Sequence, residues 1–410
     1  MSSENEDRST WPRNGQVIRR EELLRLIEEN GGPAGLDLRG ARLLNDGPTE
    51  DTISNAIDLS PEALAPLAHA WRQASGGSSP AWLNSSGGIE LWDAQLALTY
   101  LGHARLPRAS LSGANLRRAH LSDAELRGAY LQGANLQGAY LHGTQLQGAN
   151  LENARLQAAE LVATDFQDAR LGGAKLQAAM ILFANFQGAQ FNFAQLGEVD
   201  MYVAESLDGA HWHGAVLDHT RIRRDTLGKA IGDEVKALKT RWPPTYHGAK
   251  EAYLLLKNNF NQIGRYEDAS WAYVKEQQME KMAYHWEWRS QGWRVWRAWG
   301  SFRRWLRNWA YELTTGYGER PWNAVVCGLG AIVAFAVGFW ATAAIGSRGA
   351  AAFLDSLVYS ISAFATFNLA RGDLNPEGRG VEIFSSLEAI LGIGVLALVV
   401  FTLGNRMSRG

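Results

Sequence analysis

The residues best suited to chemistry form a short polar stretch between two long apolar segments. They are Thr366, Phe367, Asn368, Leu369, Ala370, Arg371, Gly372 and Asp373. If the flanking segments lie in a membrane, non-helical backbone survives between them only where it lines water or is buried in protein. Its carbonyl oxygens could then replace the water around an ion, and charged rings at a pore mouth favour one sign of ion. Arg371 would repel cations unless Asp373 pairs with it.

Three apolar segments must position this stretch. Residues 322–347 contain no charge, and residues 383–403 form a second apolar segment with Glu388 near one end. Each is long enough to cross a bilayer core of ~30 Å, which takes about 20 helical residues. Residues 353–367 form a third segment that is too short to cross, so the pattern predicts a re-entrant half-helix between two transmembrane helices.

Aromatic and basic residues precede the first apolar segment. The predicted interface residues are Trp293, Trp296, Trp299, Trp305 and Trp309, interleaved with arginines. Such a mixture can bind single-stranded nucleic acid or lie at a membrane interface. The adjacent apolar segment favours membrane lipid as the partner. The 40 Lys and Arg nearly balance the 42 Asp and Glu, which argues against a nucleic-acid partner.

The distribution of arginines predicts the orientation in the membrane. Residues 286–321 hold seven Arg, and Arg406 and Arg409 follow the second span. The loop between the spans has fewer basic residues and several acidic ones. The positive-inside rule therefore predicts a multi-pass protein of the cell membrane with both termini in the cytoplasm. The acidic opening of the chain has no basic region and no apolar core, so we expect no signal peptide.

Residues 320–410 resemble the pore module of the two-transmembrane potassium-channel family. The match rests on the segments 355–360 (Asp-Ser-Leu-Val-Tyr-Ser), 364–366 (Phe-Ala-Thr), 372–376 (Gly-Asp-Leu-Asn-Pro) and 388–392 (Glu-Ala-Ile-Leu-Gly). The resemblance implies a homotetramer around a central pore. It also implies that Thr366 opens the selectivity filter, and that Gly392 and Gly394 form an inner-helix hinge.

The filter departs from the family's Thr-Val-Gly-Tyr-Gly-Asp. Here the stretch 366–373 is two residues longer and lacks the Gly-Tyr-Gly core. Those glycines let the carbonyl groups all point inward as a substitute hydration shell. We therefore expect a membrane ion channel without strict K⁺ selectivity, whose permeant ion the sequence does not identify. The alternative is a membrane-anchored scaffold or sensor with a vestigial, non-conducting pore.

A repeat of five residues dominates the first half of the chain. From residue 91 to 201 nearly every fifth residue is Leu, Ile, Phe or Met, and Ala lies two places before most of them. A period of five fits neither a helix nor a strand. It resembles the pentapeptide-repeat family, which implies a right-handed, four-sided β-helix with four units per coil. Residues 36–43 look like one earlier unit, and the register slips by one residue near Ser206.

The surface of the repeat argues against mimicry of DNA. Residues 106–201 contain eight Asp or Glu and seven Lys or Arg, so the rod is nearly neutral. Phe183 and Val203 are 20 residues apart and should stack on one outer face. Exposed apolar groups of this kind are usually covered, and we expect the next domain of the same chain to cover them. An unknown cytoplasmic ligand or protein on the β-helix is the further partner we expect.

Helical segments flank the repeat. Residues 44–88 interrupt it, with a short helix that starts at Ser60 as its N-cap and Pro61 as its first residue. After the repeat, residues 226–240 show helical spacing. A hairpin around Gly264 is similar to a single tetratricopeptide unit.

The predicted fold is therefore multi-domain, with a β-helix, an α-helical connector and an α-helical membrane pore domain. The expected boundaries are 1–90 for the N-terminal region, 91–224 for the β-helix, 225–285 for the connector, 286–320 for the interfacial helix and 321–410 for the pore domain.

Nothing in the sequence indicates an enzyme or a cofactor. The chain has one cysteine, Cys327, which excludes a disulfide within the chain. His211, His213 and His219 lie together near the end of the repeat, where we expect them to be surface or packing residues and not metal ligands. No nucleophile–base pair or phosphate-binding loop is recognisable.

Overall fold

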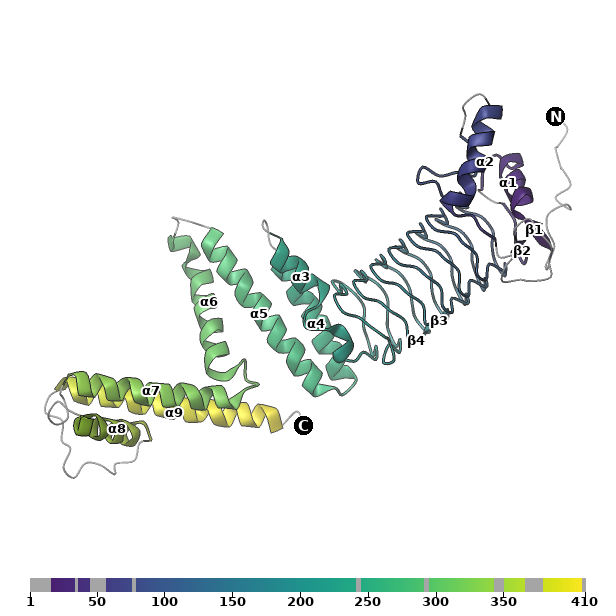
Figure 1. Cartoon of the computed structure of the whole chain (residues 1–410). Helices are drawn as coiled ribbons and strands as arrows, with labels where there is room; N and C mark the ends of the chain where they lie inside the picture. Colours follow the sequence, from purple (N-terminus) through teal and green to yellow (C-terminus); the bar gives the residue numbers. More distant parts are fainter. Residues whose placement is uncertain are drawn as a thin grey trace. The chain divides into compact units, whose positions relative to one another are not determined.

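The computed structural model describes residues 16–33, 36–44, 57–75, 79–240, 245–290, 295–342, 350–365 and 379–407. The chain divides into two compact units, Met1–Ala272 and Tyr273–Gly410. The first holds the repeat and the elements at its two ends, and the named elements in the described part of the second are helices (Figure 1). The boundary falls inside one helix, α5 (Tyr266–Ser290).

Parallel ladders with a spacing of 20 residues build the repeat. One ladder joins Gln95, Asn115, Asn135 and Arg155 in succession. In another the chain is regular enough to form two short parallel strands, β3 (Glu160–Val162) and β4 (Met180–Leu182). Four five-residue units therefore make one coil, and the inward Leu and Ala side chains are buried along its length. The β-helix implied by the resemblance to the pentapeptide-repeat family is confirmed.

The chain turns a corner at every fifth residue. The residue two places after each inward Leu has a positive φ, as in Gly133 (66°), Asn153 (59°) and Phe193 (61°). This left-handed conformation costs glycine little and other residues more. Many corners carry a residue other than glycine, so the closed coil and its ladders must hold them in that conformation.

A single extra residue shifts the ladders near the end of the repeat. Asn185 pairs with Ser206 and Gln190 with His211, a spacing of 21 residues in place of 20. The slip predicted near Ser206 is therefore confirmed. The ladders continue to Arg221, which pairs with Asp200.

Three separate segments supply the first coil. Asp37 pairs with Gln95, Asp58 with Arg105, and Glu90 with Ser110. The earlier unit predicted at 36–43 is thus part of the coil, and so is the short segment around Asp58, which we had assigned to the insertion. Helix α2 (Pro61–Ala74) leaves the coil directly after this segment. Its N-cap is Ser60, whose Oγ accepts a hydrogen bond from the Ala63 amide, as predicted.

The N-terminal end of the coil has a cover that the sequence did not predict. Strand β1 (Val17–Arg19) pairs in parallel with β2 (Arg42–Leu44) and so adds one more layer to that side. Helix α1 (Arg20–Glu29) follows and buries Leu23, Leu24 and Ile27. The inward side chains of the first coil are therefore not left open to water.

The other end of the coil is closed by short helical elements. A 3₁₀ turn (Asp225–Leu227) is followed by Gly228 at φ 68° and then by α3 (Gly232–Lys239). The continuous helix predicted over 226–240 is wrong, because this left-handed glycine separates two shorter pieces. Asp233 at the start of α3 accepts a hydrogen bond of 2.6 Å from the Trp212 amide in the last coil.

Helix α4 (Tyr246–Gln262) also belongs to this end of the coil. The side-chain amide of Asn259 donates a hydrogen bond of 2.8 Å to the Thr220 carbonyl, although the two residues are 39 positions apart in the sequence. Tyr253 is buried, and its hydroxyl donates to the Glu234 carboxylate. Gly264, at φ 75°, then turns the chain into α5, which gives the two helices of the predicted hairpin.

The second unit begins with two helices joined by aromatic side chains. Trp288 of α5 stacks on Trp305 of α6 (Val295–Thr315), with ring centroids 6.2 Å apart and planes at 14°. Phe302 and His285 join the same cluster. Lys281 forms an ion pair with Glu312 at the other end of the contact. These pairs run in opposite directions along the two helices, so α5 and α6 pack antiparallel.

Three apolar helices follow and pack on one another (Figure 1). They are α7 (Pro321–Ala341), α8 (Ala350–Phe364) and α9 (Arg379–Met407). Within the described residues, α7 and the Ile383–Gly404 part of α9 are long and apolar enough to cross a membrane, and α8 is too short. The order of a long, a short and a long apolar helix agrees with the sequence prediction.

Candidate functional site

Glycines bring the three apolar helices into close contact. A Cβ built on Gly392 of α9 would lie 1.9 Å from the carbonyl oxygen of Phe364, the last residue of α8. A Cβ on Gly328 of α7 would lie 3.1 Å from Val395 and 3.2 Å from the Phe364 ring. Only residues without a side chain allow the backbones to approach this closely. The end of α8 is therefore held in a fixed position between α7 and α9.

A carboxylate is buried in the same group of helices. Glu388 of α9 has no exposed surface, and its Oε1 lies within hydrogen-bond distance of the Ser360 hydroxyl of α8. That hydroxyl is also 2.7 Å from the Ile332 carbonyl oxygen of α7. The other carboxylate oxygen, Oε2, has no hydrogen-bond partner among the described residues. Polar groups inside an apolar helix group are costly, and they usually mark a functional site.

An apolar cavity of about 700 Å³ lies along α7 and α9 beside the end of α8. It is lined by Val325, Gly328, Leu329, Ile332, Phe364, Ala365, Gly392, Ile393, Val395, Leu396 and Val399. Among the described residues, no charged or hydroxyl-bearing side chain belongs to this lining. In the single chain the described part of this lining offers a surface for lipid or for another apolar helix.

The structure describes only part of the predicted pore. Thr366, Phe367, Asn368, Leu369, Ala370, Arg371, Gly372 and Asp373 all lie outside the described residues. Of the two predicted hinge glycines, Gly392 is buried against α8, whereas a Cβ on Gly394 would meet nothing within 4 Å. The two positions therefore differ in their surroundings, and their role as a hinge stays a prediction.

The predicted interfacial tryptophans do not share one environment. Trp305 packs inside the α5–α6 contact, while Trp299 and Trp309 are 54% and 44% exposed. Trp293 lies outside the described residues, and Trp296 belongs to α6 without a described side chain. The two exposed rings suit a membrane interface, and Trp305 instead joins two helices.

The outer face of the coil keeps exposed apolar side chains. Phe183 and Val203 are 59% and 37% exposed, so α3 and α4 of the same unit do not cover them, contrary to the expectation that the next domain does. Phe193, at 63% exposed, makes an edge contact with His213. Helices α3 and α4 close the end of the coil and leave this side open.

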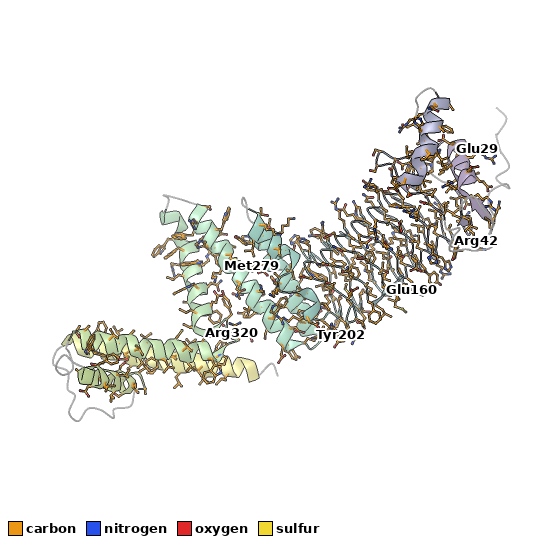
Figure 2. All side chains as sticks on the ribbon, in the orientation of Figure 1. Glu29, Arg42, Glu160, Tyr202, Met279 and Arg320 are labelled. Carbon is orange, nitrogen blue, oxygen red and sulfur yellow. The ribbon has the colours of Figure 1, made fainter. Side chains whose placement is uncertain are left out.

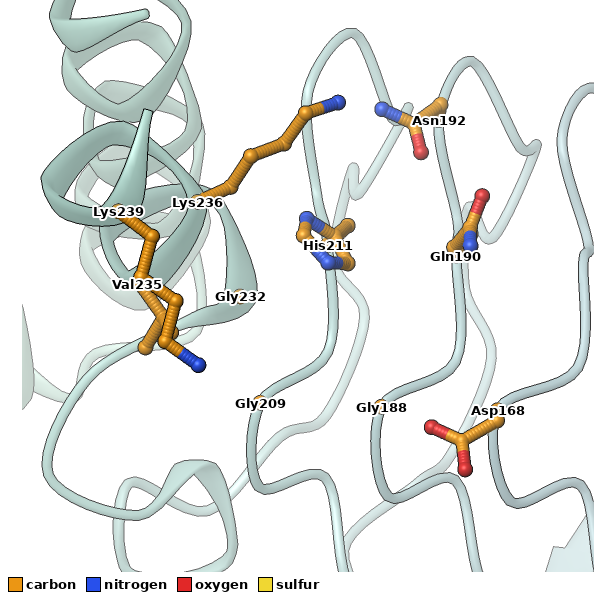
Figure 3. Close-up of a pocket in the computed structure, with 10 residues that line it drawn as sticks. All are labelled: Asp168, Gly188, Gln190, Asn192, Gly209, His211, Gly232, Val235, Lys236 and Lys239. Carbon is orange, nitrogen blue, oxygen red and sulfur yellow. The ribbon is translucent and has the colours of Figure 1, made fainter. Parts of the chain in front are cut away.

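A second cavity, of about 470 Å³, lies where α3 meets the last coils (Figure 3). Lys236 and Lys239 reach it from α3, and His211, Asn192 and Asp168 reach it from the coil. The two lysines are exposed to solvent. The lining carries charges of both signs, which does not define one class of ligand. The cavity could not be predicted from the sequence, because its residues come from several turns of the repeat and from α3.

Arginine side chains also gather around Tyr202, whose place near the end of the coil is marked in Figure 2. The guanidinium groups of Arg221, Arg223 and Arg265 lie 5.5, 5.6 and 5.9 Å from the centre of its ring. Two of these arginines also pair with carboxylates, Arg221 with Asp200 and Arg265 with Asp268. Such cation–π and ion-pair contacts stabilise the junction between the coil and the turn before α5.

The three histidines behave as packing or surface groups. His211 Nδ1 is 3.6 Å from an Asp233 oxygen, and His213 Nδ1 is 3.2 Å from a Glu251 oxygen. His219 has a left-handed backbone at a corner, and its amide donates to the Gln262 side chain. Within the described part of the chain, no three His, Cys, Asp or Glu side chains converge to form a metal site.

The ladders, corners and inward residues define the first unit as a parallel β-helix of five-residue units. Residues 94–133, 124–161, 134–173 and 159–201 match the family model for pentapeptide repeats, in eight copies. Residues 94–201 of this chain are therefore pentapeptide repeats, and the second unit adds a few apolar helices. The family match does not extend to residues 320–410, so the potassium-channel resemblance there rests on the sequence argument.

Solved structures of pentapeptide-repeat proteins resemble this chain. The protein Rfr23 from the cyanobacterium Cyanothece 51142 is 27% identical, with 40% of this chain and 91% of that chain covered and a TM-score of 0.24. HetL from Nostoc sp. strain PCC 7120, involved in the regulation of heterocyst differentiation, is 23% identical, with 50% and 94% covered and a TM-score of 0.23. A protein from the thylakoid lumen of Arabidopsis thaliana is 20% identical, with 38% and 86% covered and a TM-score of 0.17. None of the curated proteins matches this chain.

Proposed function

We propose that this chain is a membrane ion channel whose apolar helices form a pore in a homotetramer. The observation that carries the proposal is the position of α8, a helix too short to cross a membrane. It is packed between two helices that are long enough, and its last carbonyl lies against Gly392. A half-helix at membrane depth needs protein or water around the backbone that follows it. A shared central pore provides both.

Assembly follows from the same argument. Leu329, Ile393 and Leu396 line the open apolar cavity and are 58%, 59% and 66% exposed in the single chain. In a tetramer, neighbouring copies and lipid would cover them. The mass of the purified chain in nanodiscs tests this directly. We expect four copies, and a stable monomer would contradict the proposal.

The pentapeptide-repeat unit is proposed to lie in the cytoplasm, where it regulates the pore. This placement rests on the seven arginines of residues 286–321, which precede the first span. It predicts that a protease added outside sealed cells leaves residues 16–240 intact. Cleavage of the coil from outside would reverse the orientation.

Conduction and its ion preference are tested together in planar bilayers. Four copies of Arg371 near a constriction would favour anions over cations. At a dielectric constant of ~80, a unit charge ~5 Å away contributes roughly 0.8 kcal/mol, so four contribute ~3 kcal/mol. Arg371→Glu reverses that sign and should move the reversal potential in a salt gradient strongly toward cation selectivity. Arg72→Glu, the same charge change on the exposed side of α2, is the matched control and should leave it unchanged.

A second function is favoured by one observation on the coil. Phe183 and Phe193 expose large apolar rings on its outer face, and such groups usually take part in contacts. A membrane-anchored scaffold would use this face to hold a protein, with the apolar helices serving as the anchor. Reproducible unitary currents from the pure protein support the channel. The absence of currents from a correctly assembled tetramer under all tested ion gradients supports the scaffold.

A further inference from the structure

Three oxygen atoms from three helices meet inside the second unit. They are the Ile332 carbonyl of α7, the Ser360 hydroxyl of α8 and the Oε1 of Glu388 of α9. Ser360 lies between the other two, and both Ser360 and Glu388 have no exposed surface. Water therefore does not reach this contact in the chain as folded, and the hydrogens must come from the three groups themselves.

If Glu388 is ionised, the three groups have one hydrogen for two oxygen–oxygen contacts. The serine hydroxyl has one hydrogen, and the Ile332 carbonyl has none to donate. If Ser360 donates to Ile332, its contact with an ionised Glu388 contains two oxygens with no hydrogen between them. If Ser360 donates to Glu388, the 2.7 Å contact with Ile332 has the same defect. One additional hydrogen, carried by Glu388, satisfies both contacts, because Glu388 then donates to Ser360 and Ser360 donates to Ile332.

Among the residues that the structure describes, no neighbour of Glu388 supplies a positive charge instead. The helices packed around Glu388 bring these titratable or charged side chains among the described residues: Cys327 from α7, Asp355 and Tyr359 from α8, and Arg303, Arg304, Arg307, Tyr311 and Glu312 from α6. None of them forms an ion pair or hydrogen bond with Glu388. Asp355 is exposed, Arg304 lies over the Tyr284 ring, and Glu312 is paired with Lys281. An isolated buried carboxylate ion is strongly disfavoured, and a neutral acid is not.

We infer that Glu388 is a proton-binding site, and that at neutral pH its bound proton joins α7, α8 and α9 through Ser360. Removal of this proton leaves a charge with one unsatisfied contact at the place where the short helix is fixed. The site does not require that the protein conducts ions. Failure of the channel proposal therefore leaves this inference standing, and the reverse also holds.

Infrared spectroscopy of the full chain in nanodiscs tests the inference, with glutamate carboxyl carbons labelled with ¹³C. A protonated carboxylic acid and a carboxylate absorb at different frequencies, and the label separates glutamate from Asp355. At pH 7 we expect a protonated-glutamate band that is present in the wild type and absent from Glu388→Gln. Glu62→Gln, at an exposed position of α2, should retain the band. Absence of a protonated-glutamate band in the labelled wild type at pH 7 would overturn the inference.

A second variant keeps the test decisive if Glu388→Gln does not fold. Ser360→Ala removes the oxygen that accepts the proposed hydrogen, so the frequency of the band should shift. A band that stays in place in Ser360→Ala would show that the proton is not on this contact.

The pH dependence of unfolding provides an independent readout. A glutamate in the unfolded chain is ionised at neutral pH, so unfolding releases the bound proton. The unfolding equilibrium constant, measured by titration with a denaturing detergent, should then rise about tenfold per pH unit while the folded site keeps its proton. Glu388→Gln keeps a hydrogen-bond donor but has no titratable proton. The logarithm of its unfolding equilibrium constant should therefore rise less steeply with pH, by the contribution of one proton. Equal slopes for the two proteins would contradict the proposed site.

Discussion

The Cα of Gly392 faces the carbonyl oxygen of Phe364 so closely that an added Cβ would lie 1.9 Å from that oxygen. Gly394, one half-turn further along α9, has open space at the same position. The two glycines share one helix and one residue type, and they differ in whether another backbone lies against them. This difference separates a packing role from a role in bending.

Gly392→Ala should therefore destabilise the helix group by ~1–3 kcal/mol, because α8 must move to make room. Gly394→Ala should leave stability unchanged or raise it slightly, since alanine favours a helix over glycine. Thermal unfolding of the full chain in detergent, together with its mass, measures both effects. A similar loss at both positions would favour the hinge over the close contact.

The inward register of the coil can be tested with a second pair of variants. Ala134 is fully buried, and Ala134→Leu should overpack the coil at a cost of ~1–3 kcal/mol. Gln137 is only partly covered, and its side chain donates one long hydrogen bond of 3.3 Å to Gln157. Gln137→Lys should cost about 0.5 kcal/mol or less. Circular dichroism during thermal unfolding compares the two, and equal sensitivity would mean that the register is wrong.

One carboxylate links the cover at the C-terminal end of the coil to the last coil itself. Asp233 accepts the Trp212 amide hydrogen over 2.6 Å and is nearly buried. Asp233→Ala leaves that buried amide without an acceptor, which should cost ~1–3 kcal/mol. The control is Asp225→Ala, because Asp225 is exposed and forms only a surface ion pair with Arg223. Its loss should cost less than ~1 kcal/mol. Limited proteolysis should release α3 and α4 faster in Asp233→Ala than in the control.

Alkaline pH should weaken the same end of the coil. Burial raises the pKa of the Tyr253 hydroxyl, and the nearby Glu234 carboxylate raises it further. The contribution of Tyr253 to stability is therefore complete below pH ~10, the pKa of an unfolded tyrosine, and is lost as the pH rises above it. Tyr253→Phe should be less stable than the wild type at pH 8 by ~0.5–1.5 kcal/mol, for the lost hydrogen bond. The difference in stability between wild type and Tyr253→Phe, measured by urea titration, should become smaller between pH 10 and 11. A difference that stays constant would contradict a buried, protonated Tyr253 hydroxyl.

The repeat could be predicted from the sequence because each coil imposes the same requirement on every fifth residue. Leu131 and Ala134 occupy positions that recur in every unit of the repeat. A wrong register at one unit would therefore conflict with the pattern of all the other units. The cover formed by β1 and α1 has no such redundancy. Val17–Arg19 is only three residues long, and its pairing with Arg42–Leu44 depends on contacts that local sequence does not encode.

The helical parts were predicted less completely, for two physical reasons. The spacing of Leu227, Ile231 and Val235 fits one helix, but Gly228 adopts a left-handed conformation that no periodicity reveals. The contact between Ser360 and Glu388 joins two helices that are 28 residues apart, so it depends on the rotation of each helix about its axis. The apolar pattern predicts that the helices exist and leaves these rotations open.

The constant offset between ladder partners makes the length of the coil adjustable in whole steps. Residues 135–154 form one complete turn, and the ladders that enter and leave it present the same groups. If such a block of 20 residues is removed or duplicated, the neighbouring turns can still pair through equivalent ladders. The distance between the two capped ends then changes by ~4.8 Å, the spacing of one turn. The number of turns thus sets the distance between the two ends of the coil, and this distance can change without any change in the elements that cap the ends.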